Sequence, residues 1–396
     1  MKNKELAYYL FGASVNVIMI FSNGAIIQAF LALIGLLPDQ IGIYSFCVYA
    51  TQMIALIISS FCVDKIKNIP KTTAIFTLPS LLFFAIMIFL SIFDQIEINS
   101  MFVITLIACS FWNFFYGLII AVYYKLPYYI VDIAEYPRVL NSLGIIRNTL
   151  GVLISGMFVF LTKIFDYQKV ILVCFVIASI FKLLAFLSVY SIKNRMMVNE
   201  EKENKKISLG ILSLKATRWF VLPNVMRGIS TGIMGMATVI MLSTITKDIS
   251  LSSSPTVIFS LASILSCTFY SKIYRHIKTV NLAILGSIIQ CVGLVFLVLG
   301  NTTVFFIMYF IACFGLVIVD FAVPIYVTQI IPYEYVGGYT AMSTLFYTIG
   351  TAIGSYISGI LVTDKVFILL VICGVSQITH VVSYALYERL YSRDKF

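Results

Sequence analysis

The stretch EYPRVLNSLGIIRNTLG at residues 135–151 returns in degenerate form as EYVGGYTAMSTLFYTIG at residues 334–350. Both stretches open on Glu-Tyr, and the threonine and the glycine that follow keep their spacing, so the second lies 199 residues after the first. A repeat of such a long period indicates that a chain is built from two related parts. We therefore expect a duplicated fold.

The composition is typical of an integral membrane protein. Hydrophobic residues make up 61% of the 396 residues, charged residues only 11%, and the mean hydropathy is +1.01, whereas about 25% of the residues of a soluble domain are charged. A helix needs about 20 mainly apolar residues to cross a bilayer. Twelve blocks approach or exceed this length, at residues 6–30, 40–62, 72–92, 101–125, 140–162, 168–191, 219–243, 252–270, 279–299, 303–331, 338–362 and 365–387. With the repeat, they predict an all-α membrane protein of twelve transmembrane helices in two pseudo-symmetric six-helix halves.

The longest polar stretch, at residues 193–215, has mixed charges and no apolar periodicity, which is typical of a solvated linker. It predicts an N-terminal bundle at 1–192 and a C-terminal bundle at 216–396. Twelve spans would place nineteen Lys and Arg residues on the side of the two termini and four on the other. Because positive residues favour the cytoplasmic side, we expect both termini in the cytoplasm and the protein in the plasma membrane. The net charge of +10 then reflects topology, and no nucleic-acid partner is expected.

Patterns of catalysis and metal binding are missing from the sequence. The eight cysteines fall within apolar blocks without paired spacing, which indicates small buried hydrophobic residues and not disulfides or metal ligands. The two histidines are isolated, and no phosphate-binding G-x-x-x-x-G-K-[ST] loop occurs. We expect no enzyme, no cofactor and no resident metal.

Basic loops occupy equivalent places in the two predicted halves. Asp64-Lys65-Ile66-Lys67 follows the second block, and Ser271-Lys272-Ile273-Tyr274-Arg275 follows the eighth. With these loops, the twelve blocks and the central linker, nearly the whole chain resembles the major facilitator superfamily of secondary transporters. That superfamily carries a glycine, three residues, then Asp-Arg and a basic run in the first of these loops. Here Ser60 takes the place of the glycine, Asp64 keeps the acid and Lys65 replaces the arginine.

The resemblance implies that this loop forms a cytoplasmic gate. Asp64 would cap the start of the eleventh block, where free amides and the positive helix end favour an anion. Lys65 would pair with Asp132 or Glu135, in a charged group that includes Arg138. Such contacts would exist only while the cytoplasmic side is closed, so they would shift the conformational equilibrium without touching the solute. The alternative is that these residues are ordinary charged residues at the membrane interface and have no role in gating.

In the resembled superfamily the first, fourth, seventh and tenth helices surround a central cavity, so polar residues of those blocks are candidate solute ligands. On a helix, Asn224, Arg227 and Thr231 fall on one face, since successive residues turn by about 100°. The candidate set is Asn16, Asn23, Asn113, Tyr116, Tyr124, Asn224, Arg227 and Thr231. For each of them, hydrogen bonding between neighbouring helices is the alternative.

Several charged residues lie inside the predicted spans, where each costs roughly 2.5–3.5 kcal/mol and needs a partner, water or a function. Arg227 and Asp320 could form an ion pair across the cavity, and Asp320 is the only acid deep inside any block. Burial favours a neutral carboxyl and Arg227 favours the carboxylate, so solute binding to Arg227 could let Asp320 take a proton; a purely structural pair is the alternative. Arg147 is a further cavity candidate. Lys182 is expected at the periphery, where it can snorkel to the membrane surface.

Two transport functions and one function of another class remain open. The first is a monomeric secondary transporter that moves a small hydrophilic solute by alternating access, either coupled to protons or facilitative. The second is an exporter of lipophilic drugs or metabolites, for which 32 Phe and 14 Met would form an adaptable cavity. Against it, the fifth block lacks the Gly-Pro pair of such exporters, and Asn113 stands where they carry an arginine. A membrane-embedded receptor or enzyme fits poorly.

Overall fold

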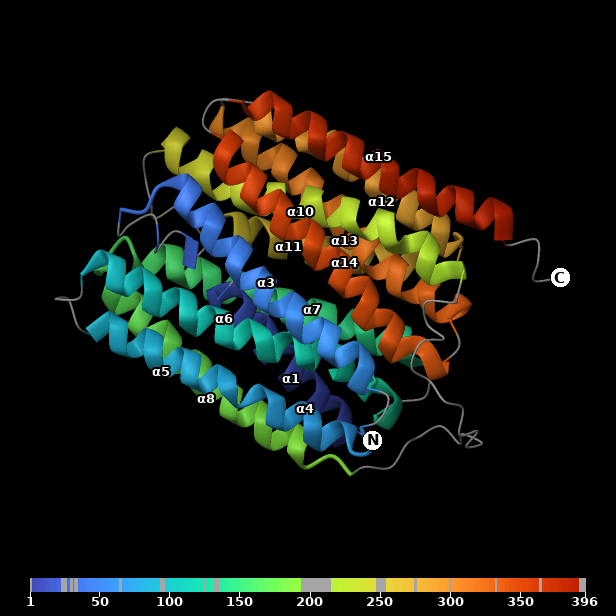
Figure 1. The fold of residues 1–396 in the computed structure, drawn as a ribbon, viewed down its shortest axis with the longest axis horizontal. Coiled ribbons are helices and arrows are strands. Elements are labelled where there is room, and N and C mark those ends of the chain that lie inside the picture. Colours follow the sequence, from blue (N-terminus) through green and yellow to red (C-terminus); the bar gives the residue numbers. More distant parts are fainter. Residues whose placement is uncertain are drawn as a thin grey trace.

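The computed structural model describes residues 2–22, 27–28, 31, 35–63, 66–92, 97–123, 125–130, 135–193, 215–246, 254–273, 276–298, 301–331, 333–362 and 365–391. Helices make up most of these residues, which contain no strand. The long helices lie side by side along the longest dimension of the molecule (Figure 1).

The described helices agree with the twelve predicted spans. Ten spans are single helices, and two are formed by a pair of shorter ones. They are α1 (Lys2–Ser22), α3 (Pro38–Cys62), α4 (Ile69–Thr77) with α5 (Pro79–Ile92), α6 (Ile98–Tyr123), α7 (Tyr136–Leu161), α8 (Tyr167–Tyr190), α10 (Lys215–Thr246), α11 (Ser254–Ile273), α12 (Thr279–Gly293) with η5 (Leu294–Val298), α13 (Thr302–Ile330), α14 (Tyr333–Leu361) and α15 (Val366–Tyr391). By length and composition, nine helical segments of the described chain can cross a membrane. The predicted all-α, twelve-helix membrane architecture is confirmed.

Proline and asparagine define several helix ends. Pro79 begins α5 directly after α4 ends at Thr77, because a proline has no N–H to donate and its ring clashes with the preceding turn. Asn68 caps α4, since its Oδ1 accepts a hydrogen bond from the N–H of Lys71 at 3.1 Å. Pro38 takes the first position of α3, where the missing N–H has no intrahelical partner in any case.

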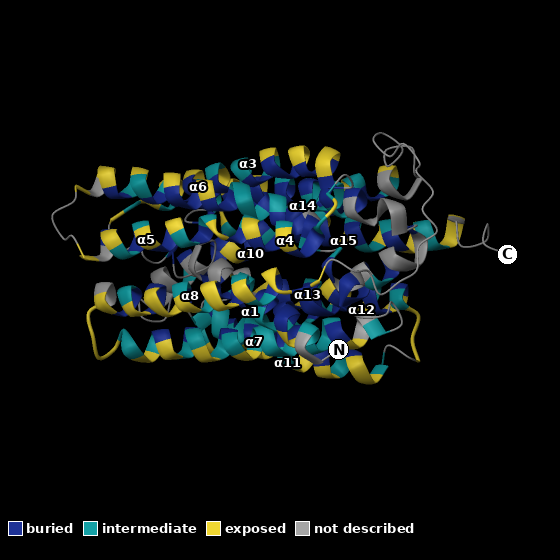
Figure 2. Ribbon diagram, turned by 90° about the horizontal axis from the view of Figure 1, so that it is seen from below, coloured by how far each residue is buried: buried dark blue, intermediate teal, exposed yellow. Residues whose placement is uncertain are grey.

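Apolar side chains cover the outside of the bundle. In Figure 2 exposed residues recur along the outer faces of α3, α5 and α8. Large apolar residues on the outside include Ile107, Phe160 and Phe367, which are 62%, 62% and 68% exposed. Soluble proteins rarely expose apolar surface on this scale, so this outer surface is the one that contacts lipid.

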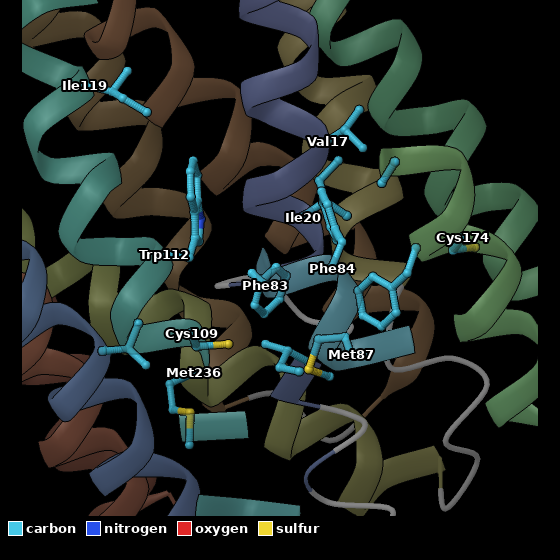
Figure 3. Packing of buried hydrophobic residues seen from close by; sticks show 14 of the residues in the cluster. Val17, Ile20, Phe83, Phe84, Met87, Cys109, Trp112, Ile119, Cys174 and Met236 are labelled. Atoms are coloured by element: carbon cyan, nitrogen blue, oxygen red, sulfur yellow. The ribbon is translucent and has the colours of Figure 1, made fainter. Parts of the chain in front are cut away.

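Aromatic packing fills the interior between α5 and its neighbours. Phe83 and Phe84 of α5 lie 6.1 and 5.8 Å, between ring centroids, from Phe175 of α8. Val17 and Ile20 of α1 belong to the same buried cluster (Figure 3). This packing joins α1, α5 and α8 into one layer beside the cavity described below.

Helices α1 to α8 lie on one side of the bundle and α10 to α15 on the other (Figure 1). The main contacts between these groups join α3 to α14 and α7 to α11. Gly42 of α3 meets Gly359 of α14 so closely that a Cβ on Gly42 would lie 3.4 Å from the Cα of Gly359. Most of the linker at 193–215 lies outside the described residues, and the division into two domains at that linker stays a prediction.

A close helix crossing joins α10 to α14. Gly228 and Gly232 of α10 meet Gly350 and Gly354 of α14, and a Cβ at any of the four would overlap backbone atoms of the other helix. Glycines four residues apart on both helices permit this approach. The crossing holds α10, which carries Arg227, against the polar face of α14.

Candidate solute-binding cavity

A cavity of about 720 Å³ lies among α1, α3, α6, α7, α10, α11, α13 and α14. Gln28 and Pro255 line it near the end of the bundle opposite the termini. Leu140 and Tyr339 line it within about two turns of the starts of α7 and α14. The cavity therefore extends through most of the bundle, and its volume is in the range of about 300–1,000 Å³ that is usual for small-molecule sites.

Arg227 of α10 and Asp320 of α13 form an ion pair in the wall of this cavity. Their side chains are 13% and 43% exposed, so the carboxylate is open to the cavity while the guanidinium is largely covered. Arg227 Cζ lies 5.5 Å from the ring centroid of Tyr347, a cation–π contact. Ion pairing offsets the cost of holding two charges at this depth.

The predicted polar face of α10, which carries Asn224, Arg227 and Thr231, lines the cavity over only part of the helix. Asn224 donates from Nδ2 to Ser343 Oγ of α14 at 3.0 Å, and Thr231 donates to the backbone carbonyl of Arg227 at 3.0 Å. Both residues line the cavity. Thr238, further along the same face, is buried and donates to the carbonyl of Met234.

Asn16 of α1 and Arg147 of α7 meet at the cavity wall. Asn16 Nδ2 donates to the backbone carbonyl of Arg147 at 3.1 Å, and Arg147 Nη2 donates to Asn16 Oδ1 at 3.3 Å. One amide thus bonds both the backbone and the side chain of Arg147, which orients the guanidinium. Two residues proposed separately from the sequence belong to one cluster.

Tyrosines form much of the remaining polar lining. Tyr116, the sequence candidate on α6, is among them. The others come from α3, α6, α13 and α14 and were not predicted: Tyr49, Tyr123, Tyr309, Tyr339 and Tyr347. The resemblance directed attention to four helices, so the contribution of α3 and α14 had no signal in the sequence.

Asn113 departs from its predicted place. Its side chain is fully buried, its Nδ2 donates to the carbonyl of Cys109 at 2.8 Å, and it is not among the described residues that line the cavity. The physical reason is that α6 satisfies this amide within its own helix. We therefore leave Asn113 out of the proposed site. Two further candidates, Asn23 and Tyr124, lie outside the described residues.

The predicted gate is described only in part, because Asp64, Lys65 and Asp132 lie outside the described residues. Arg138 pairs with Glu135 at 3.0 Å and with Glu5 of α1 at 3.4 Å. These pairs join the start of α7 to α1 at the end of the bundle that carries the termini. The role of this cluster in gating stays a prediction.

Lys182 of α8 contradicts the expectation of a snorkelling lysine. It is 1% exposed, and its Nζ lies 5.5 and 5.3 Å from the ring centroids of Phe11 and Trp112. The ammonium has no hydrogen-bond partner among the described residues. Packing of α8 against α1, together with the ring of Trp112, encloses the side chain before it can reach the membrane surface; Figure 3 shows Trp112 in this core.

Replacing Lys182 by Met is expected to raise the melting temperature of the purified protein in detergent. A methionine of similar length would keep the contacts with the two rings and remove a buried cation that has no hydrogen bond among the described residues, and the burial of a single charge costs on the order of several kcal/mol. Thermal unfolding of both proteins, followed by intrinsic fluorescence, checks this. A fall in melting temperature would mean that the cation–π contacts outweigh the burial of the charge.

Comparison with known proteins agrees with this architecture. The family model of the Major Facilitator Superfamily matches residues 9–355. No curated protein matches the chain. A bacterial homologue of the iron transporter ferroportin, solved in its outward-facing state, superimposes with a TM-score of 0.74 over 98% of this chain and 99% of that chain, at 12% identity. A mutant of the nucleoside transporter NupG gives 0.66 over 97% and 99% at 13% identity. At these identities the likeness to the solved structures shows the fold alone.

Proposed function

Because the chain belongs to the major facilitator superfamily, it is a multi-pass membrane transporter and not an enzyme, and we propose that it moves a small hydrophilic solute across the plasma membrane by proton-coupled alternating access. The observation that carries this proposal is the cavity of about 720 Å³ with the Arg227–Asp320 ion pair in its wall. By the excess of Lys and Arg on their side, both termini lie in the cytoplasm.

The polar lining supports a hydrophilic solute. Side-chain amides of Asn16, Gln52, Asn148 and Asn224 contribute to the wall together with the tyrosines. Polar groups covered by a ligand lose their water, which costs free energy unless the ligand supplies hydrogen bonds in return. A solute with hydroxyl or carbonyl groups meets this requirement, whereas a purely apolar compound does not.

Asp320 is the residue that we propose to carry the proton. Among the described residues that line the cavity it is the only acid, and its side chain is open to the cavity. A solute that binds Arg227 withdraws part of the guanidinium charge from Asp320, and loss of an opposite charge favours the protonated carboxyl. Solute binding and proton binding then support each other, as coupled transport requires.

The experiment that tests the function is thermal unfolding of the purified full chain in detergent against a panel of solutes. A ligand that binds the native state raises the melting temperature by mass action. We expect stabilisation by one class of sugars, nucleosides, amino acids or organic anions. Stabilisation only by lipophilic cations, such as ethidium and tetraphenylphosphonium, would contradict the proposal and favour an exporter.

A further inference from the structure

We propose that the transported solute is an organic anion and that Arg147 binds its negative charge. This inference rests on the proposed function, and it concerns a residue outside the coupling pair. Three charged residues line the cavity within the described chain: Arg147, Arg227 and Asp320. Arg227 and Asp320 neutralise each other, so the lining carries one positive charge in excess.

Arg147 holds that excess charge. Among the described residues, its side chain donates a hydrogen bond only to the neutral Oδ1 of Asn16, and none of their acidic side chains lies within ion-pair distance of it. A guanidinium has five N–H donors, so Asn16 leaves most of them to water or to a ligand. A cation in this position is the feature that a binding site for an anion needs.

The three charges lie in one layer of the bundle. Arg147 is eleven residues into α7 and Arg227 twelve residues into α10, while Asp320 lies ten residues before the end of α13. At 1.5 Å per residue, each is about 15–18 Å from the end that carries the termini. Each residue therefore lies in the middle third of its helix, away from both ends of the bundle.

The geometry of a guanidinium indicates which anions fit. Its planar fork matches a carboxylate or a phosphate through two parallel hydrogen bonds. Asn16 fixes the fork from the side of α1, and Tyr116 and Tyr347 line the same cavity. The site therefore fits a small organic carboxylate or phosphate ester with further polar groups.

The test compares solutes that differ in charge and little else. The melting temperature of the full chain is measured with gluconate against glucose, benzoate against benzamide, and glycerol phosphate against glycerol. We expect at least one anion to stabilise the wild-type protein and its neutral counterpart to fail. In Arg147→Gln the same stabilisation should require about tenfold or more of that anion, because a hydrogen bond to a charged group is lost.

Matched variants separate binding from folding. Lys169→Gln removes an exposed cation that pairs with Asp166 at 3.0 Å outside the cavity, and it should respond to the anion as the wild type does. Arg147→Lys keeps the charge and loses the fork, so an intermediate response is expected. If Arg147→Gln does not fold, the response to the anion is compared between the wild type, Arg147→Lys and Asn16→Ala. The last variant removes the hydrogen bond that orients the guanidinium.

Three outcomes would count against the inference. Stabilisation by the neutral members of the pairs, with no anion effective, would refute the anion and leave the proposed hydrophilic transporter standing. Equal stabilisation of the wild type and Arg147→Gln by an anion would refute the role of Arg147. Failure of all six solutes would count against both this inference and the proposed function.

Discussion

Asp320→Asn is expected to abolish accumulation of the solute driven by a pH difference, while exchange of solute across the membrane continues. Asparagine has nearly the shape of aspartate and cannot carry a proton, so solute movement would no longer be linked to proton movement. In the wild type, one proton per solute allows about tenfold accumulation per pH unit when no net charge moves. A singly charged anion together with one proton meets that condition.

Accumulation and exchange of labelled solute in proteoliposomes measure the two activities separately. Asp166→Asn is the matched control, because its carboxylate is 77% exposed, pairs with Lys169 and does not line the cavity. The melting temperature of Asp320→Asn is needed as well, since Arg227 loses its partner and an unpaired buried cation is destabilising. Unchanged accumulation driven by pH in a folded Asp320→Asn protein would refute the coupling role.

Gly350→Val is expected to destabilise the protein strongly, with loss of most folded material on extraction into detergent. A side chain at this position would overlap the carbonyl of Val225 on α10, and backbone atoms cannot move aside as a flexible side chain can. Overpacking of this kind usually costs about 1–3 kcal/mol and sometimes more. The expected result is a melting temperature several degrees lower and a smaller monodisperse peak in size-exclusion chromatography.

Gly156→Val is the control for the glycine variant. Gly156 also lies inside a transmembrane helix, α7, and a Cβ there would meet nothing within 4 Å. Both variants therefore add the same β-branched residue to a helix, and only one of them meets another backbone. Equal stability of the two variants would show that the α10–α14 crossing is looser than described.

The fold follows from the sequence because its signals are long and local. Each span needs only a run of apolar residues, and a block of about 20 such residues has few alternatives in a membrane. The same holds for the ion pair: Asp320 is the one acid deep inside a block, so Arg227 was its natural partner. The crossing of α10 and α14 is different, because Gly228 and Gly232 meet Gly350 and Gly354 from a helix more than 100 residues away, and one sequence gives no signal for that pairing.

The site was less predictable because it depends on which helices meet. Helical periodicity predicts the helix face on which Asn113 lies. It does not predict that the side-chain amide donates a hydrogen bond to the carbonyl of Cys109 in the same helix. The contact of Asn16 with Arg147 joins residues 131 positions apart, for which one sequence offers no signal. Lys182 was misplaced for the same reason, since its burial follows from the packing of α8 against Phe11 and Trp112.

The most direct test of the central claim is solute counterflow in proteoliposomes made with the purified full chain. The vesicles are loaded with the solute that stabilises the protein most, and labelled solute is added outside. We predict saturable entry of label that exceeds entry into protein-free vesicles and increases when a pH difference is imposed. Entry no faster than into protein-free vesicles, with the protein folded and inserted, would contradict a transporter of that solute.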